Sequence, residues 1–420
     1  MNPRILLPLI LLSALPLRAA DWSQYRGPNL DGSTPEKIAA WPAGGPKVLW
    51  KTPSTNGFSS FAVAGARCFV LEGREAGGAP QEVLVARETG TGKELWSAPL
   101  GSAKFDGGGN SGTGDNKGGD GPRSSPATDG THVFTLSGQL VLQSFDASGG
   151  RELWKKDLIA EFAGRNIQWQ NAASPLLEGG VLYVAGGGAG SSLLAFNAAD
   201  GAVVWKACDE KMTHATPVAA TILGQRQIIF FVQSGLVAVE PKTGRELWRY
   251  AFNYSTSTAA SPVVAGNIVW CSAGYGIGAG AVRVAKAGAQ WTATELYRLR
   301  GNNVANHWST PVQKDGFLYG MFQFKEYGRG PVKCVDIRDG SVKWEQAGFG
   351  PGQVILAGDK VLALTDAGEL VVFDAKPDAY HEFARAKVLD GKCWGTAILS
   401  GGRIFARSTK EAVCLDVSGK

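Results

Sequence analysis

A short motif recurs along this chain and constrains its fold more than any other feature. Each copy contains a Gly in a turn and a Trp four residues later. The clearest copies end at Trp96, Trp154, Trp205, Trp248 and Trp344. Self-similarity with a period of roughly 40 to 60 residues is typical of repeat arrays and of β-propellers, in which each repeat buries its apolar face against the next.

The start of each repeat also follows a pattern. A small hydroxyl residue followed by Pro opens units at Ser125, Ser174, Thr216, Ser261 and Thr310. Later in the units, apolar runs such as 181–184 and 236–240 favour strands, and the Gly turns favour hairpins between strands. Each unit therefore holds about four strands, which is one propeller blade. We expect the repeated Trp side chains to pack in the core between neighbouring blades.

Two units are degenerate and the last one is incomplete. The unit at 261–297 lacks the Thr-Gly turn and ends at Tyr297, and the unit at 354–383 ends without a Trp. The final unit, 394–417, stops after its third strand, whereas residues 46–50 copy the turn, strand and Trp with no unit before them. A strand there that completes the last blade would close the ring and cover an exposed sheet edge. We therefore predict an all-β, eight-bladed β-propeller of four-stranded antiparallel blades at 46–420, its last blade closed by an N-terminal strand.

The first residues have the pattern of a secretory signal peptide, which we place at 1–20. Arg4 precedes an apolar stretch at 5–17, and Ala19 and Ala20 offer two cleavage points. The apolar stretch is shorter than the about 20 residues that span a bilayer, and no later stretch is long enough. We expect a soluble periplasmic or secreted protein with no transmembrane segment, in which an N-terminal segment at 21–45 precedes the propeller.

Charge and cysteine usage exclude several classes of protein. The formal net charge of +5 has no clustered basic source, so we predict no nucleic-acid partner. The six cysteines form no CxxC or CxxCH pattern, which argues against clustered zinc sites and covalent haem. Cys68, Cys271, Cys334 and Cys414 lie in apolar runs and are predicted to be buried thiols, while their spacing defines no disulfide pairing.

The repeats from Trp50 to Val417 resemble the pyrroloquinoline-quinone (PQQ) type repeat. The segment Asp21–Pro28, which reads DWSQYRGP, resembles the opening of exported bacterial PQQ-binding-like β-propellers. The resemblance implies one of two kinds of relative. Quinoprotein alcohol dehydrogenases bind PQQ and calcium inside the ring, whereas the propeller subunit of the outer-membrane protein assembly machinery is a cofactor-free scaffold. Fold alone does not separate the two functions.

The residues argue against the dehydrogenase. The resemblance implies two adjacent cysteines over the quinone, and the chain has no Cys-Cys pair. The family's calcium-binding set of Asp, Asn and Glu has no residue-by-residue match. The loop at 101–123 contains Asp115, Asn116 and Asp120, whose oxygens are suitable calcium ligands, but its Gly-rich composition favours a flexible surface loop. We expect no cofactor, with PQQ and calcium required only under the dehydrogenase alternative. Neither a GxSxG, a P-loop nor an HExxH motif is present, and no catalytic residue is assigned.

Polar and aromatic residues gather in the loops that lead into the first strand of each unit. In a propeller these loops surround one end of the central channel. The predicted ligand- or partner-binding residues are Phe58, Arg123, Trp169, Asn171, His214, His307, Trp308, Gln353, Lys392 and Trp394. Such groups converging on a concave surface suit a sugar, a peptide or a flat ring. For any single residue, hydrogen bonding to water and loop backbone is at least as good an explanation.

These observations lead to one favoured function and two alternatives. We expect a non-catalytic, exported, monomeric propeller that binds a protein partner or a small polar or ring-containing ligand at one end of the channel, or that acts as a scaffold. The alternatives are a PQQ- and calcium-dependent quinoprotein oxidoreductase and a carbohydrate-binding module that uses the loop tryptophans.

Overall fold

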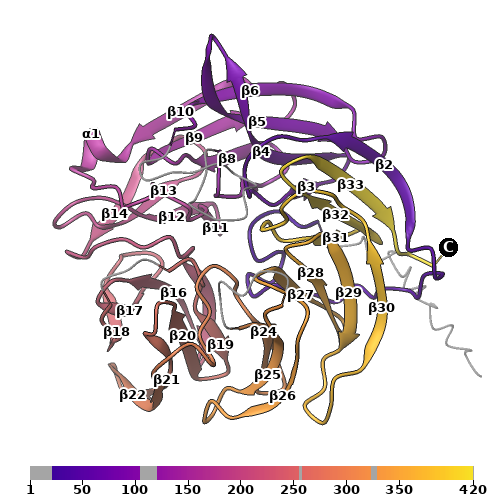
Figure 1. The fold of residues 1–420 in the computed structure, drawn as a ribbon. Coiled ribbons are helices and arrows are strands. Elements are labelled where there is room, and N and C mark those ends of the chain that lie inside the picture. The colour runs from indigo at the N-terminus through magenta and orange to yellow at the C-terminus, as the bar shows by residue number, and fades with distance from the viewer. Residues whose placement is uncertain (1–20, 105–120, 255–257, 323–328, 420) are drawn as a thin grey trace, which may run out of the picture.

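The computed structural model describes residues 21–104, 121–254, 258–322 and 329–419. Within these ranges the chain forms eight β-sheets, which stand side by side in a ring around a central channel (Figure 1). The first strands of neighbouring sheets contact one another, so these strands line the channel and the later strands lie progressively outward. The predicted all-β, eight-bladed propeller is confirmed.

Blades are numbered here by the order of their channel-lining strands. Blade 1 holds β3 (Ala62–Ala64), β4 (Arg67–Ala76), β5 (Ala79–Glu88) and β6 (Glu94–Ser102). Blade 2 holds β7 (Ala127–Thr128), β8 (His132–Leu136), β9 (Val141–Asp146) and β10 (Glu152–Asp157), followed by the short helix α1 (Leu158–Phe162). Blade 3 holds β11 (Leu176–Glu178), β12 (Val181–Ala185), β13 (Leu193–Asn197) and β14 (Val203–Ala207). Blade 4 holds β15 (Val218–Ile222), β16 (Gln225–Val232), β17 (Gly235–Val239) and β18 (Glu246–Ala251).

The second half of the ring repeats this plan. Blade 5 holds β19 (Val263–Ala265), β20 (Ile268–Ala273), β21 (Gly278–Ala287) and β22 (Gln290–Leu299). Blade 6 holds β23 (Val312–Lys314), β24 (Phe317–Met321), β25 (Val332–Asp336) and β26 (Val342–Gln346). Blade 7 holds β27 (Gln353–Ala357), β28 (Lys360–Leu364), β29 (Glu369–Asp374) and β30 (Glu382–Lys387). Blade 8 holds β31 (Ile398–Ser400), β32 (Arg403–Arg407) and β33 (Glu411–Asp416), and its fourth strand is β2 (Lys47–Pro53).

Blade 8 closes the ring as predicted. Strand β2 pairs antiparallel with β33, and Trp50 lies opposite Cys414 in the register. The N-terminal and C-terminal parts of the chain therefore share one sheet, and they lie side by side in Figure 1. This pairing covers the edge of β33, which would otherwise present unpaired backbone groups to solvent.

The N-terminal segment crosses the channel, a role that the sequence did not indicate. The carbonyl groups of Trp22 and Ser23 accept hydrogen bonds from Val63 of blade 1 and Thr128 of blade 2. The Gln24 amide pairs with the backbone of Leu177 in blade 3. The segment then reaches the far side of the ring, where β1 (Ser33–Thr34) pairs in parallel with β27 of blade 7. Blade 7 consequently has five strands.

Several of the repeated Trp residues pack against the next blade. The indole N–H of Trp205 in blade 3 donates to the carbonyl of Pro241 in blade 4 at 2.8 Å. The same indole covers the turn glycine of blade 4, because a methyl group added at Gly244 would lie 2.6 Å from the ring. Trp50, Trp96 and Trp154 contact the next blade's turn glycine in the same way. The Gly and the Trp of the sequence motif are therefore partners across each blade boundary rather than within one blade.

The degenerate blade 5 breaks this scheme on both of its sides. No Trp covers its turn glycine, because a methyl group added at Gly288 would meet nothing within 4 Å. Trp248 of blade 4 instead donates to the Gln227 side chain of its own blade at 2.7 Å. On the other side, Tyr297 and Leu299 take the place of a Trp against Gly340 of blade 6. Other side-chain contacts therefore replace the Trp–Gly contact at these two blade boundaries.

The prediction that all repeated Trp side chains are core is wrong for half of them. Trp50, Trp205 and Trp248 are buried, whereas Trp96, Trp154 and Trp344 are half-buried. The Trp belongs to the outermost strand of its blade, so one face of the indole packs on the neighbouring glycine while the other is free to meet solvent. The four cysteines predicted to be buried are buried, and all six are free thiols.

The Trp–Gly contact can be tested inside one blade. Gly244 and Gly224 both adopt left-handed backbone conformations in blade 4, but a methyl group at Gly224 would meet nothing within 4 Å. Gly224→Ala is expected to cost roughly 1–2 kcal/mol from backbone strain alone. Gly244→Ala should lose a further 1–3 kcal/mol or so from overlap with Trp205. Urea denaturation measures both, and equal losses would show that the contact does not matter.

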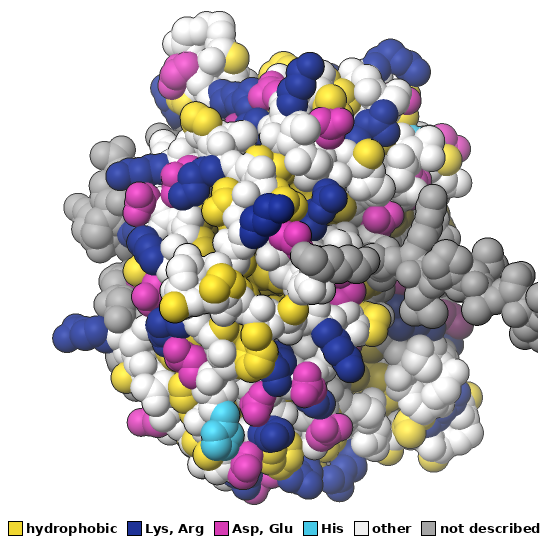
Figure 2. Space-filling model, turned by 90° about the vertical axis from the view of Figure 1, so that its right-hand side faces the viewer, with side chains coloured by type: hydrophobic (Ala, Val, Ile, Leu, Met, Phe, Trp, Pro, Cys, Tyr) yellow, Lys and Arg dark blue, Asp and Glu magenta, His cyan; other side chains and the backbone are white. Residues whose placement is uncertain are grey.

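Two segments about which the sequence made predictions lie outside the described residues. They are the signal peptide at 1–20 and most of the Gly-rich loop, including Asp115, Asn116 and Asp120. In the part of the chain that is described, no helix is long and apolar enough to cross a membrane. The side of the ring shown in Figure 2 carries Lys and Arg side chains interspersed with Asp and Glu, without a large area of one sign.

Candidate binding site at one end of the channel

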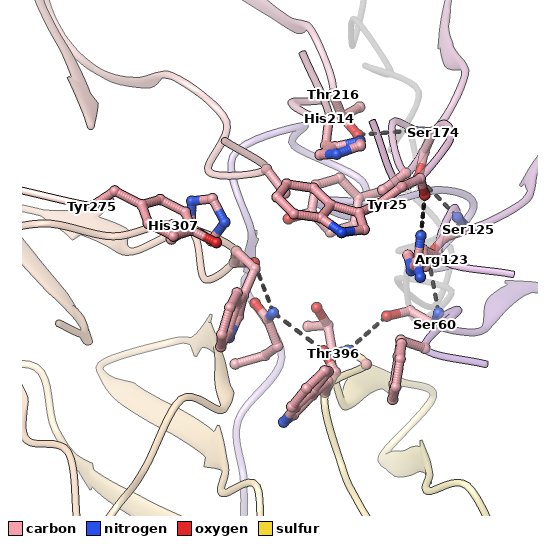
Figure 3. Close-up of a pocket in the computed structure, with 18 residues that line it drawn as sticks. Tyr25, Ser60, Arg123, Ser125, Ser174, His214, Thr216, Tyr275, His307 and Thr396 are labelled. Atoms are coloured by element: carbon pink, nitrogen blue, oxygen red, sulfur yellow. Dashed lines mark hydrogen bonds between the residues drawn. The ribbon is translucent and has the colours of Figure 1, made fainter. Parts of the chain in front are cut away.

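A cavity of about 430 Å³ opens at the end of the channel where the loops lead into the first strands. We call it the mouth cavity, and Figure 3 shows its lining side chains around an open space. All eight blades contribute to it. The lining residues are Tyr25, Phe58, Ser60, Arg123, Ser125, Trp169, Ala172, Ser174, His214, Thr216, Ala259, Tyr275, His307, Trp308, Gln353, Trp394, Gly395 and Thr396.

Eight of the ten residues predicted to bind a ligand or partner line this cavity. They are Phe58, Arg123, Trp169, His214, His307, Trp308, Gln353 and Trp394. Their convergence is a geometrical finding, and their binding role stays a prediction. Asn171 and Lys392 lie outside the lining. The buried Asn171 amide bonds backbone groups of its own region, including both polar groups of Ala173, and the Lys392 ammonium lies 4.5 Å from the centre of the Trp394 ring.

One wall of the mouth cavity is aromatic. The rings of Trp308 and Trp394 stack with centroids 5.3 Å apart and planes inclined by 25°. Phe58 extends this surface, with its ring centroid 4.7 Å from that of Trp394. Gln353 holds both tryptophans in place, because its side-chain amide donates to the carbonyls of Trp308 at 2.9 Å and Trp394 at 3.2 Å. His307 meets Trp308 edge-on at 5.3 Å.

Trp169 lies on a strained loop that a network of hydrogen bonds holds in place. Trp169 and Gln170 both have positive φ angles, 67° and 55°, which is unusual for two successive residues other than glycine. Arg123 donates to the Trp169 carbonyl. On either side of this turn, the Asn166 side chain and the Asn171 backbone N–H both donate to the carbonyl of Gly138. Strain of this kind persists only where the surroundings enforce it, and it is often found at functional sites.

The described lining residues include a positively charged side chain and no negatively charged one. Arg123 supplies a guanidinium, and the lining contains no Asp or Glu among the described residues. Burial, with the charge of Arg123 and contact with His307, lowers the pKa of His214 to about 3, so this imidazole is neutral at pH 7.

A buried carboxyl group lies behind this wall. Glu82 is only 1% exposed, and its oxygens accept the backbone N–H of Gly138 at 3.1 and 3.3 Å. Burial raises its pKa to about 7, against the opposing effects of the Gly138 N–H and the Arg123 charge. Glu82 is consequently only partly ionised near neutral pH. It holds Gly138, which in turn anchors the loop that carries Trp169.

A chain of hydroxyl groups forms the deeper wall and joins the blades. The backbone N–H of Thr396 donates to Ser60 at 2.7 Å, and that of Ser60 donates to Ser125 at 2.9 Å. Ser125 donates to Ser174, and Ser174 to Thr216, at 2.8 and 2.9 Å. Several dashed lines in Figure 3 mark these bonds. The hydroxyl residue before Pro is thus explained in four of the repeats, since Ser125, Ser174, Thr216 and Thr310 each accept a buried N–H from the neighbouring blade.

The floor of the mouth cavity comes from the N-terminal segment. Tyr25 lines the cavity and its hydroxyl lies 3.2 Å from that of Thr310. Arg26 beside it is buried and donates to the carbonyls of Thr310 and Pro311. No site residue was predicted in this segment, although its DWSQYRGP motif resembles the opening of related propellers. Tyr275, which lies between β20 and β21, belongs to no sequence motif that would have identified it as a lining residue.

The donor set does not suit the calcium of a quinoprotein site. Calcium prefers six to eight oxygen ligands rich in carboxylates. The described lining offers hydroxyl and carbonyl oxygens, no carboxylate, and an arginine that repels a cation. Among the described residues, moreover, no group of three or more His, Cys, Asp or Glu side chains is placed to hold a metal ion.

Solved structures of two kinds share the fold. The quinohemoprotein alcohol dehydrogenase of Comamonas testosteroni superposes with a TM-score of 0.65 at 13% identity, covering 95% of this chain and 81% of that one. BamB from Moraxella catarrhalis superposes with a TM-score of 0.56 at 14% identity, covering 85% and 94%. At these identities the likeness concerns the fold alone.

Sequence comparison separates the two kinds of relative. The chain is 23% identical over 287 residues to the outer membrane protein assembly factor BamB of Yersinia pestis, covering 63% of this chain and 68% of the relative. The same protein of Shewanella oneidensis is 23% identical over 269 residues, covering 60% and 64%. The chain therefore spans about two thirds of the length of these curated relatives. A family model described as outer membrane protein assembly factor BamB matches residues 80–346, and the chain belongs to this family of PQQ-type repeat propellers.

Proposed function

We propose that this chain is an exported, non-catalytic binding propeller that holds a ring-containing ligand, or an aromatic side chain of a protein partner, in the mouth cavity. One observation carries the proposal. Four aromatic side chains on a single concave surface, Phe58, Trp169, Trp308 and Trp394, are only half-buried. The half-buried repeat tryptophans lie apart on the outer strands of separate blades, whereas these four rings face one shared cavity, which is typical of a binding site.

The chemistry of the lining favours binding over catalysis. Its described residues include a single cation and no carboxylate, so no pair of carboxyl groups is present there to act as acid and base. Its Ser and Thr hydroxyls join neighbouring blades by accepting backbone N–H groups, which gives them a structural role. The family membership supports the same conclusion, because its curated members are described as assembly factors.

Fluorescence of the neutral ring probe N-phenyl-1-naphthylamine tests the proposal. We expect the purified protein to bind the probe, and Trp394→Ala or Phe58→Ala to weaken binding roughly tenfold, since an aromatic contact contributes about 0.5–1.5 kcal/mol beyond the area it buries. Phe383→Ala is the matched control, because Phe383 is an aromatic residue on β30 that is 42% exposed and far from the cavity lining. Equal binding by all variants would place the probe elsewhere and contradict the proposal.

A second experiment tests the dehydrogenase alternative. The protein is incubated with PQQ and Ca²⁺, and alcohol-dependent dye reduction is then followed together with the quinone absorbance. We expect no dye reduction, because the described cavity lining offers no carboxylate ligand for calcium. Alcohol-dependent turnover would establish an oxidoreductase and overturn the non-catalytic proposal.

A further inference from the structure

We propose that a second surface, a groove across blades 3, 4 and 5 at the other end of the ring, binds an acidic segment of a protein partner in an extended conformation. We call this surface the rim groove. It encloses a volume of about 1110 Å³, and its lining includes Val204 of blade 3, Lys242 of blade 4, and Lys286 and Trp291 of blade 5. The site is separate from the mouth cavity, so the inference goes beyond the proposed function.

The position of the rim groove follows from the strand order of the blades. Its lining comes mainly from the turns that follow the first and third strands, and from the strand ends beside them. Gln225 begins β16 after the turn from β15, Lys242 lies between β17 and β18, and Gly288 lies between β21 and β22. Antiparallel strands reverse direction at each turn, so these turns lie opposite the loops that form the mouth cavity. Both surfaces can therefore be occupied at once.

The two arginines of the rim groove are paired within the lining. The Arg226 guanidinium lies 2.8 Å from the Glu178 carboxylate, and the Arg245 guanidinium lies 3.5 Å from the Glu240 carboxylate. Each pair is neutral as a whole. These four residues therefore contribute little net charge to the groove, and its sign is determined by the remaining charged residues of the lining.

The two lysines of the rim groove give it a net positive charge. Lys242 and Lys286 are exposed, and neither has a carboxylate partner among the described residues. The Lys286 ammonium instead donates to the Gln225 side-chain oxygen at 3.0 Å and lies 4.8 Å from the centre of the Trp291 ring. An acidic partner would supply the carboxylates that these two ammonium groups lack, and charge complementarity of this kind favours specific association.

The rim groove also offers apolar surface on a fixed wall. Val204 lines it and is 43% exposed. The carbonyl of Pro241, on the neighbouring blade, accepts hydrogen bonds from the Tyr183 hydroxyl at 3.2 Å and the Trp205 indole at 2.8 Å, which hold blades 3 and 4 together at the groove. An extended peptide with alternating acidic and apolar residues presents the two kinds of side chain on opposite faces. Such a peptide can meet the lysines and the apolar wall together.

The shape of the rim groove favours a peptide over a membrane surface. The groove is larger than the mouth cavity, at about 1110 Å³ against 430 Å³, and it spans three blades. An anionic bilayer is flat on this scale and would leave such a concave surface unfilled. An extended chain of several residues can enter it and bury both its acidic and its apolar side chains.

Fluorescence anisotropy with a matched pair of peptides tests this inference. The peptides EVEVE and QVQVQ, labelled with the same dye, have equal length and identical apolar residues and differ in charge. We expect EVEVE to bind about tenfold more tightly, since each exposed ion pair contributes a factor of roughly two to five. Lys242→Gln and Lys286→Gln should each remove one such factor, and together they should abolish the difference between the peptides. Val204→Ser should weaken both peptides equally, because it removes apolar contact alone.

Lys155→Gln is the matched control. Lys155 is an exposed lysine on β10 of blade 2 and lies outside the lining of the rim groove, so this variant should bind EVEVE like the parent protein. On the unmodified protein, the affinity for EVEVE should fall as salt rises from about 0.05 to about 0.5 M, because salt screens exposed ion pairs. EVEVE should not displace N-phenyl-1-naphthylamine, because the two probes occupy different ends of the ring.

Three results would overturn the inference and leave the proposed function intact. They are equal binding of the two peptides, EVEVE binding that survives the double lysine substitution, and displacement of N-phenyl-1-naphthylamine by EVEVE. Sedimentation with phosphatidylglycerol vesicles gives a fourth. Vesicle binding that depends on Lys242 and Lys286, without binding of EVEVE, would assign the rim groove to a membrane surface instead of a peptide.

Discussion

Deletion of residues 21–52 is expected to leave the protein aggregated or to lower its Tm by more than about 10 °C. The deletion removes most of β2, so β33 loses its partner strand and exposes its edge. It also removes the buried Trp50, whose loss alone is expected to cost about 3–5 kcal/mol. In a chain of this size each kcal/mol corresponds to about 1 °C, so the loss of Trp50 accounts for about 3–5 °C and the exposed edge of β33 for the rest. Size-exclusion chromatography and thermal denaturation measure the outcome.

A shorter deletion distinguishes the effect of losing ring closure from the effect of losing the segment that crosses the channel. Removal of residues 21–38 keeps β2 and Trp50 but loses Tyr25 and β1. We expect this variant to remain monomeric with a smaller fall in Tm, because the edge of β33 stays covered. If the longer deletion is as soluble and stable as the parent protein, strand β2 does not hold the ring together and the closure described here is wrong.

Trp248→Ala should destabilise the protein by about 3–5 kcal/mol, the usual range for removal of a large buried aromatic side chain. Trp248 is 3% exposed and packs in an apolar cluster with Tyr250 and Trp291. Its indole N–H also satisfies the buried Gln227, whose carbonyl oxygen would lose its partner. Urea denaturation of the variant measures the loss.

Trp154→Ala provides the comparison, because Trp154 is the repeat residue of blade 2 and is only half-buried. Its expected cost is roughly half that of Trp248→Ala, in proportion to the apolar area it buries. Phe383→Ala on the exposed face of β30 should be close to neutral. A near-neutral Trp248→Ala would mean that Trp248 is not part of the core of blades 4 and 5.

The ring and its closure were predictable because they depend on local patterns. A turn glycine followed by a Trp marks most of the outer strands, and the incomplete last unit together with the isolated copy at 46–50 indicates their pairing. The partnership between a Trp and the next blade's glycine was not predictable, since it joins residues about 40 to 55 positions apart. The half-buried state of Trp96 and Trp154 has the same origin, because exposure at the rim depends on the neighbouring blade.

The lining of the mouth cavity was predictable for a different reason. The loops that lead into the first strands gather at one end of any propeller, so residues such as Phe58 and Trp394 come together whatever their identity. Sequence position does not determine which way a side chain points within its loop. The positive φ angles at Trp169 and Gln170 precede Asn171, whose amide bonds backbone instead of facing the cavity. Local sequence gives no sign of this turn.

Tyr25 was beyond prediction because its contact joins distant parts of the chain. Its partner Thr310 is 285 residues away, and the segment that carries it is held by several blades at once. Such placement follows from the closed ring rather than from any local pattern. Tyr275 comes to the cavity edge because its ring meets His307 at 5.0 Å, again a contact between separate loops.

A crystal structure of the protein with N-phenyl-1-naphthylamine bound tests most directly whether the mouth cavity is a binding site for rings. We predict one bound molecule in the mouth cavity, with its rings against Phe58 and Trp394. A molecule found only on the outer surface of the ring, for instance in the groove lined by Arg226, Lys242 and Trp291, would contradict it.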